Sequence, residues 1–296
     1  MSQYQRLLLI INPALRHSPA INRAAALAKA SGATLHIVAL IKPVETLLLL
    51  EKNIQEKVRD SYFKDHSEWL KDEAARMRVR GINVTTEVTW ADDTEYEILQ
   101  HVTKIQPDLL IKDVQHEPAI KRAFITPMDW HLLRECPVPL YLVGASGHTL
   151  PHKIVAAVDP SRPELQESGL NDRIIQEANS LALQCDAELH LLHAYDVSSV
   201  YLGDAGGGGL ALTNLTKELR NVLEKSFLTL ADHYGVPPDR RHFILGQPVS
   251  VLAEFASQHQ VDVIVMGRIH RHGLEKLIGS TTEHILYQTS CSILAV

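Results

Sequence analysis

Two short segments near the end of the chain contain glycine, and the second also has a hydroxyl side chain. Together these residues are suited to binding a phosphate group. Met266-Gly267 ends an apolar run, and Gly279-Ser280 follows twelve residues later, at the start of a helical stretch. Glycine lets backbone N–H groups approach an anion closely, and a helix start adds free amides, the positive end of the helix dipole and a hydroxyl donor. The spacing alone also fits a turn glycine followed by a helix cap, so both interpretations stay open.

Other chemistries find less support in the sequence. It contains neither a Walker A loop nor a GxGxxG after the first strand, and it lacks the Gly-x-Ser-x-Gly elbow of serine hydrolases. Cys136 and Cys291 precede the last strand of each half, where we expect small buried hydrophobes rather than nucleophiles. Among the 16 histidines, His190 and His193 would point to opposite faces of one strand, and no Cys/His spacing matches zinc. We therefore predict no nucleophilic catalysis and no metal site.

Apolar strands alternate with helical stretches along the whole chain, which is the pattern of a parallel sheet covered on both faces. The predicted strands are 6–12, 34–41, 82–90, 108–113, 138–143, 153–158, 187–194, 241–245, 262–266 and 292–296. The predicted helices are 19–31, 54–79, 93–104, 126–135, 170–184, 214–234, 248–258 and 280–288. Right-handed crossovers with the first strand central place the ligand crevice at the carboxyl ends of the strands, after strands one, two and four.

Most of the two halves repeat each other at a shift of 154 residues, whereas their openings, residues 9–13 and 156–160, align at a shift of 147. Residues 104–114, KIQPDLLIKDV, align with residues 258–268, QHQVDVIVMGR, and Gly81 aligns with Gly235. We predict two duplicated domains, 1–146 and 151–296, joined by a turn-rich linker. The segment 201–210 carries four consecutive glycines, which fits either a lid over a ligand or an unconstrained surface loop.

Composition limits the partners and the compartment. The chain is 45% hydrophobic and 22% charged, with a formal net charge of −6, and its pI is about 6.2. Clustered Lys and Arg carry affinity for phosphate backbones, so we do not expect nucleic acid as a partner. The apolar runs are too short for a signal peptide or a membrane span, and three cysteines fit a reducing compartment. We predict a cytoplasmic protein.

The stretch VIVMGRIHRHGLEKLIGSTTEHILYQTSCSILAV, residues 263–296, resembles the C-terminal signature of the universal stress protein family. That signature reads Gly, two residues, Gly, nine residues, Gly, then Ser or Thr. The resemblance covers almost the whole chain, and FITPMDWHLLRECP, residues 124–137, resembles the universal stress protein E subgroup. It implies an α/β fold with two tandem doubly wound, Rossmann-like five-stranded parallel sheets in the order 3-2-1-4-5. It also implies that ATP, with Mg²⁺ accompanying it, binds at the crevice in the ATP-binding branch.

Carried over position by position, the resemblance implies a nucleotide site in the second half. The implied residues are Asp159, Ala194, Met266, Gly267, Arg268, His270, Gly279, Ser280, Thr281 and Thr282. His270 stands where the signature has its second glycine, and the spacing from Gly267 to Ser280 is one residue shorter than in the family. The His270 ring and Arg268 could donate hydrogen bonds or charge to the same phosphates.

The first half departs further from the signature. Asn12 replaces the Asp of the first strand, Asp113 replaces Gly267, and Ile125 replaces Gly279, while Thr126 remains opposite Ser280. A carboxylate aimed at the phosphate position repels an anion, so we expect no ATP in this half.

Two classes of function follow. The leading one is a stress-response regulator that binds ATP or a related adenine nucleotide in its second domain and signals through protein partners, with slow ATP hydrolysis at most. The alternative is a carrier or sensor of another small or lipid-like ligand in the first-domain crevice. We also expect the family's usual dimer to be internal, with Leu140–Val143 and Ile293–Val296 pairing the two halves, and we leave further dimerisation open.

Overall fold

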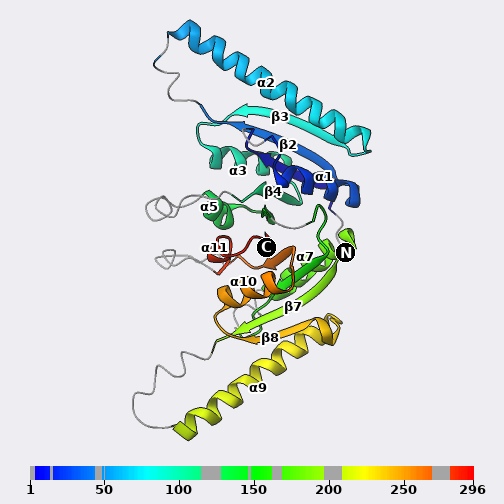
Figure 1. Cartoon of the computed structure of the whole chain (residues 1–296), viewed down its shortest axis with the longest axis vertical. Coiled ribbons are helices and arrows are strands. Elements are labelled where there is room, and N and C mark those ends of the chain that lie inside the picture. Colours follow the sequence, from blue (N-terminus) through cyan, green and yellow to red (C-terminus); the bar gives the residue numbers. More distant parts are fainter. Residues whose placement is uncertain are drawn as a thin grey trace. The chain divides into compact units, whose positions relative to one another are not determined.

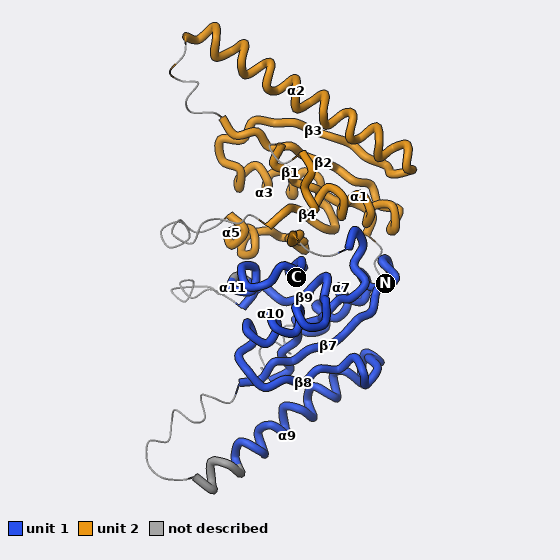
Figure 2. Tube along the Cα trace, viewed as in Figure 1, with its two compact units in different colours: residues 1, 146–296 blue, residues 2–145 orange. Residues whose placement is uncertain are grey.

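The protein forms two compact α/β units. This computed structural model describes residues 4–13, 16–43, 49, 51–114, 128–145, 148–161, 169–196, 209–268 and 281–296. The units are Ser2–Ala145, here called the first half, and Ser146–Val296, the second half, which are orange and blue in Figure 2.

Strands and helices alternate in the first half (Figure 1). Its strands are β1 (Arg6–Ile11), β2 (Thr34–Ile41), β3 (Val84–Trp90), β4 (Leu109–Asp113) and β5 (Leu140–Val143). Its helices are α1 (Pro19–Ser31), α2 (Lys52–Val79), α3 (Thr94–Ile105) and α5 (Met128–Glu135). The strands pair in parallel in the order β3-β2-β1-β4-β5.

The second half repeats this plan. Its strands are β6 (Lys153–Ala157), β7 (Glu188–Tyr195), β8 (Arg241–Leu245), β9 (Val263–Met266) and β10 (Ser292–Ala295). Its helices are α7 (Leu170–Cys185), α9 (Gly209–His233), the 3₁₀ turn η2 (Pro238–Arg240), α10 (Pro248–Gln258) and α11 (Thr281–Ile285). The strands pair in parallel in the order β8-β7-β6-β9-β10. The predicted doubly wound parallel fold is confirmed, and each half has the strand order 3-2-1-4-5.

Helices cover both faces of the first-half sheet, which is why its central strands are apolar along their whole length. Residues 7–11 of β1 are all buried. In β4 the consecutive residues Lys112 and Asp113 show the two faces directly, because neighbouring side chains of a strand point in opposite directions. Lys112 reaches Asp129 of α5, whereas Asp113 reaches the backbone of Ala20 in α1. Helices α5 and α1 therefore lie on opposite faces.

The second helix of each half is long and is packed mainly through its C-terminal part. Helix α2 lies along β3 and α9 lies along β8 (Figure 1). The buried positions of α2 are confined to its second half, at His66, Leu70, Ala74 and Met77. Both helices end at a glycine in the left-handed region, Gly81 with φ of 82° and Gly235 with φ of 63°. This conformation explains why glycine recurs there at the repeat spacing.

Element boundaries differ from the prediction mainly in two helices. Helix α9 begins at Gly209 rather than near residue 214, because Leu210, Ala211 and Leu212 are good helix formers. The predicted helix 280–288 is helical only over Thr281–Ile285, and a tighter turn follows in which the N–H of Gln288 donates to the carbonyl of Ile285. Residues 201–208 of the glycine-rich segment, for which a lid and a surface loop were alternatives, lie outside the described residues.

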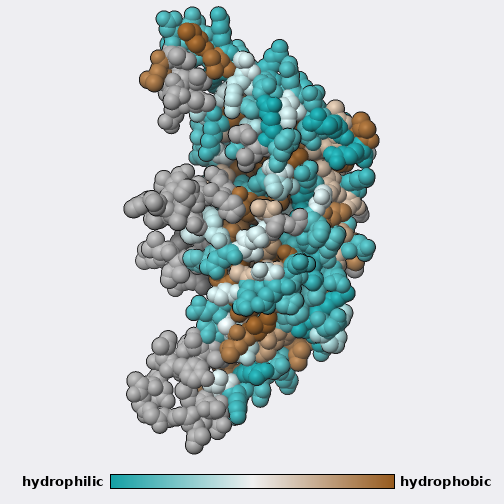
Figure 3. All heavy atoms as spheres, viewed as in Figure 1, coloured by the Kyte–Doolittle hydropathy of each residue, from teal (hydrophilic) through white to brown (hydrophobic). Residues whose placement is uncertain are grey.

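The surface is largely hydrophilic on the face drawn in Figure 3. Exposed large apolar side chains occur mostly singly along the chain, for example Val79, Leu183 and Leu245. Within the described ranges, no helix combines the length and the apolar character needed to cross a membrane.

Candidate functional site

The turn after β6 holds Asp159, and its backbone is fastened to helix α7. The Oδ1 of Asn171 accepts a hydrogen bond from the Asp159 N–H at 2.9 Å, and its Nδ2 donates to the Asp159 carbonyl at 3.0 Å. Asn171 lies in the first turn of α7 and is buried. This two-point contact fixes Asp159 at the carboxyl end of the central strand, where the crevice was predicted.

The Asp159 carboxylate closes its own turn. Its Oδ1 accepts hydrogen bonds from the N–H of Ser161 at 3.1 Å and from the Ser161 hydroxyl. The side chain is half-buried, so the negative charge remains at the edge of the sheet. This contact holds the Asp159 carboxylate within the turn at the edge of the sheet.

Strand β7 places Ala194 and His193 beside this turn, on opposite faces of the sheet. The Nδ1 of His193 donates to the carbonyl of Val158 at 3.0 Å, one residue before Asp159. The ring lies near Phe227 of α9 and Phe243 of β8, with centroids 6.1 Å and 5.7 Å away. Burial lowers the pKa of His193, which favours the neutral ring. His193 therefore positions the Asp159 turn, a role that the sequence did not reveal.

Gly267 follows β9 at the same edge, and its lack of a side chain is required by packing. A Cβ at this position would lie 2.7 Å from Cδ2 of Leu170, the first residue of α7. Such an approach is closer than van der Waals contact permits, so a side chain at this position requires Leu170 to shift. Met266 is buried, and the Arg268 N–H is donated to the carbonyl of Val296 at 2.7 Å. The turn-glycine interpretation thus explains Gly267, and the Arg268 N–H already has a partner.

Helix α11 is attached to this strand end through Thr282. Its hydroxyl donates to the Gly267 carbonyl at 2.9 Å, and the residue is only 2% exposed. Thr282 is therefore occupied in positioning the loop, whereas the preceding residue, Thr281, is half-buried at the helix start. The predicted residues His270, Gly279 and Ser280 lie outside the described residues. The structure brings Asp159, Ala194, Met266, Gly267, Arg268, Thr281 and Thr282 to the carboxyl edge of the second-half sheet.

The corresponding position of the first half is filled by a carboxylate. Asp113 Oδ1 accepts a hydrogen bond at 2.9 Å from the N–H of Ala20, in the first turn of α1. Helix α7 starts three residues earlier than α1 in the repeat register, which leaves room for a side chain at residue 113 but not at residue 267. A helix N-terminus that could meet a phosphate therefore meets the protein's own anion in this half. Ile125 and Thr126 lie outside the described residues.

A buried ion pair next to Asp113 was not predicted from the sequence. The ammonium of Lys112 lies 2.5 Å from Oδ1 of Asp129 and 2.7 Å from the carbonyl of Asp113. Lys112 is 5% exposed and Asp129 is fully buried. The pair joins β4 to α5 in the interior of the first half, where the second half has Met266 at the position of Lys112.

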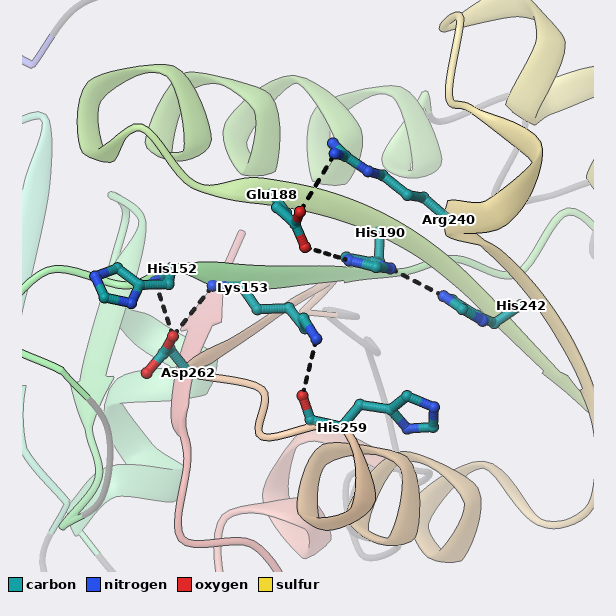
Figure 4. A network of polar contacts seen from close by, with 8 residues as sticks. All are labelled: His152, Lys153, Glu188, His190, Arg240, His242, His259 and Asp262. Atoms are coloured by element: carbon teal, nitrogen blue, oxygen red, sulfur yellow. Dashed lines mark hydrogen bonds and ion pairs between the residues drawn. The ribbon is translucent and has the colours of Figure 1, made fainter.

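Several histidines of the second half gather at the amino ends of the strands, away from this edge (Figure 4). His190 Nδ1 lies 3.0 Å from His242 Nε2, and His190 Nε2 lies 3.5 Å from the Glu188 carboxylate. Burial, with the nearby His190, His259 and Lys153, lowers the pKa of His242 to about 4. No group of three or more His, Cys, Asp or Glu residues could hold a metal ion within the part of the chain that the structure describes.

The Asp262 carboxylate at this amino edge is held by backbone N–H groups. Burial alone would raise its pKa, but hydrogen bonds from the N–H groups of His152, His148 and Lys153 lower it. Asp262 aligns with Asp108 of the first half, which accepts hydrogen bonds from the N–H groups of Gln5 and Arg6. The repeated aspartate therefore supports the structure, joining two strand starts in each half.

The three cysteines are free and buried. Burial raises the pKa of the Cys291 thiol to about 11, which disfavours the reactive thiolate. The prediction that Cys136 and Cys291 are buried is confirmed.

Comparisons with known proteins agree with this architecture. The profile of the universal stress protein family matches residues 3–144 and 151–296. Universal stress protein E of Photorhabdus laumondii is 28% identical over all of this chain and 96% of its own length, and that of Escherichia coli K12 is 25% identical over all of this chain and 95% of its own length.

Solved structures show the same fold. A universal stress protein of Pseudomonas aeruginosa UCBPP-PA14 superposes with a TM-score of 0.76 at 24% identity, covering 99% of this chain and 93% of that one. One from Archaeoglobus fulgidus gives a TM-score of 0.65 at 14% identity, covering 99% of this chain and 96% of that one. The chain therefore belongs to the universal stress protein family, as a tandem-domain member similar to universal stress protein E.

Proposed function

We propose that this stress-response protein binds ATP or a related adenine nucleotide in its second half and passes the bound state to a protein partner in the cytoplasm. The first half does not bind the nucleotide. The protein acts by binding, with slow hydrolysis at most. Two described aspartates, Asp159 after β6 and Asp196 after β7, lie at the carboxyl ends of these strands.

The observation that supports this division is the contrast between Asp113 and Gly267. In the first half a carboxylate accepts the N–H of Ala20 at the start of α1, so an incoming phosphate would face a negative charge. In the second half the matching position has no side chain and carries no charge. The anion is therefore favoured in the second half and opposed in the first.

Different residues of the second half would contact different parts of the nucleotide. Asp159 and the strand ends at Ala194 and Met266 would hold the adenosine part, as the family resemblance implies. Arg268 and the hydroxyl of Thr281 would meet the phosphates, together with His270, Gly279 and Ser280 of the adjoining loop. Asn171, His193 and Thr282 position this set, because their hydrogen bonds go to the backbone of residues 158, 159 and 267. Mg²⁺ would enter with the phosphates it coordinates.

The small-molecule content of the freshly purified full chain tests this function. The protein is denatured, and the released compounds are separated and identified by mass spectrometry. We expect an adenine nucleotide at close to one per chain. A chain that releases another ligand and no nucleotide, and that fails to take up added ATP, would contradict the proposal and favour the carrier function.

A further inference from the structure

The aromatic residues of the two halves are distributed unequally. All three tryptophans, Trp69, Trp90 and Trp130, belong to the first half. Trp90 is the last residue of β3, so it lies at the carboxyl edge of the first-half sheet. Helix α2 passes along this strand and brings further rings to it (Figure 1).

Four side chains form a continuous row at this edge, here called the Trp90 cluster: Arg59, Tyr62, His66 and Trp90. The guanidinium carbon of Arg59 lies 4.9 Å from the centre of the Trp90 ring. The Trp90 and Tyr62 ring centres are 6.2 Å apart at 31°, and the Tyr62 and His66 centres are 4.3 Å apart at 80°. Arg59, Tyr62 and His66 are spaced by three and four residues, so they share one face of α2.

His66 has unmet hydrogen-bonding capacity in this row. The residue is 3% exposed, and neither ring nitrogen has a hydrogen-bond partner among the described residues. Burial lowers the pKa of His66, so the ring is neutral and offers one N–H donor and one acceptor. Burying polar atoms without partners destabilises a fold, and leucine would fill the same space without that cost. A group that accepts the N–H of His66 on binding would offset it.

Arg59 supplies a positive charge at the other end of the row. The ion pairs among the described residues do not include Arg59, and the residue is solvent-exposed. Arg16, which lies 5.9 Å from the centre of the Trp69 ring, is instead already paired with Asp65. A guanidinium held against an aromatic face keeps its N–H edge free for a planar carboxylate. The single positive charge of Arg59 matches the single negative charge of a carboxylate.

We propose that the Trp90 cluster is a binding site for a small aromatic carboxylate. The carboxylate binds Arg59, the ring lies against Tyr62 and Trp90, and His66 donates a hydrogen bond to a polar atom of the ligand. This site belongs to the first half and uses none of the residues proposed for the nucleotide. The first half, which we propose does not bind the nucleotide, would thus bind a different ligand, an aromatic carboxylate.

The test is a calorimetric titration of the full chain with benzoate, 4-hydroxybenzoate and 2-naphthoate, with tryptophan fluorescence followed in parallel. Benzyl alcohol serves as a control that lacks the carboxylate, and cyclohexanecarboxylate serves as a control that lacks the aromatic ring. We expect one site per chain for at least one aromatic acid, a change in fluorescence on binding, and at least tenfold weaker binding of both comparison compounds. Absence of binding by all three acids would overturn the proposal.

Variants separate ligand binding from structural support. Arg59→Met should weaken binding of the aromatic acid at least tenfold. Arg80 is an exposed arginine at the C-terminal end of the same helix, and Arg80→Met should leave this affinity unchanged. His66→Leu should weaken binding and raise the midpoint of thermal unfolding, because it removes the unpartnered ring. An affinity unchanged in both Arg59→Met and His66→Leu would also overturn the proposal. ATP binding should be the same in all these variants, so failure here is distinct from failure of the nucleotide site.

Discussion

At the residue scale, glycine at 267 has a structural explanation that also bears on function. Leu170 packs directly on its Cα, so the residue is required whether or not a phosphate binds nearby. The sequence left a phosphate cradle and a turn glycine as alternatives, and the contact with Leu170 supports the second for this residue. A phosphate site would then depend on the start of α11 at Thr281 and on the charge of Arg268.

Gly267→Ala should destabilise the second half by about 1–3 kcal/mol, because its Cβ would press on Leu170. Urea unfolding followed by circular dichroism measures the change. In a Leu170→Ala background the same change at residue 267 should cost less, since the smaller side chain makes room for the new methyl group. If Gly267→Ala is as stable as the unmodified protein, the packing explanation is wrong.

A second residue-scale prediction concerns pH. The pKa of His242 is lowered to about 4 in the folded protein, whereas an unfolded histidine titrates near 6.5. Between these values the unfolded chain binds the proton and the folded chain does not, so stability falls as pH falls from about 6.5 toward 4. His242→Gln should reduce this loss, measured as the thermal midpoint from pH 7 to pH 4. His233→Gln, an exposed histidine of α9, should leave the slope as it was, and an equal effect of both changes would contradict the assignment.

At the element scale, the two halves differ in how the first helix meets the fourth strand. Helix α7 starts almost one turn earlier than α1, and the space that its Leu170 fills in the second half is available to Asp113 in the first. On the opposite face of the same strand, Lys112 and Asp129 form a buried pair between β4 and α5. A short difference in helix length thus accompanies a carboxylate at residue 113 in one half and a residue without a side chain at 267 in the other.

Lys112→Met should destabilise the first half by about 3–5 kcal/mol, because it leaves the Asp129 carboxylate buried without its partner. Since Trp69, Trp90 and Trp130 all lie in this half, tryptophan fluorescence during urea unfolding reports on it selectively. The double variant Lys112→Met with Asp129→Leu should recover most of the loss. A double variant no more stable than Lys112→Met would show that the pair is not the cause.

The elements were largely predictable from the sequence, and the particular contacts were not. Buried parallel strands appear as apolar runs, so β2 matches its predicted range residue for residue. The less buried edge strand β8 also matches its predicted range. Lys112 interrupts such a run, and nothing local shows that Asp129, seventeen positions away, neutralises it. The Leu170 contact and the row beside Trp90 join residues from distant elements. Their chemistry appears only when the fold brings them together.

At the scale of the whole molecule, the two repeated halves have the same fold but different residues at the carboxyl ends of their strands. We propose that the last strands, β5 and β10, pair the halves, since each would otherwise leave backbone groups unpaired. Amide hydrogen exchange tests this arrangement. The alternate amides of β5 not used in pairing with β4, and those of β10 not used with β9, should be protected in the monomeric chain. Rapid exchange of both sets would contradict the pairing.

Calorimetric titration with ATP tests the central claim, that the second half binds the nucleotide and the first does not. The unmodified chain should bind one ATP. Gly279→Asp should weaken binding about tenfold to a hundredfold or more, because the new carboxylate repels phosphate and its Cβ obstructs charge-assisted bonds of about 1.5–3 kcal/mol each. Ile125→Asp, the matched change in the first half, should leave the affinity unchanged. Equal loss from both changes, no loss from Gly279→Asp, or no ATP binding by the unmodified protein would contradict the account.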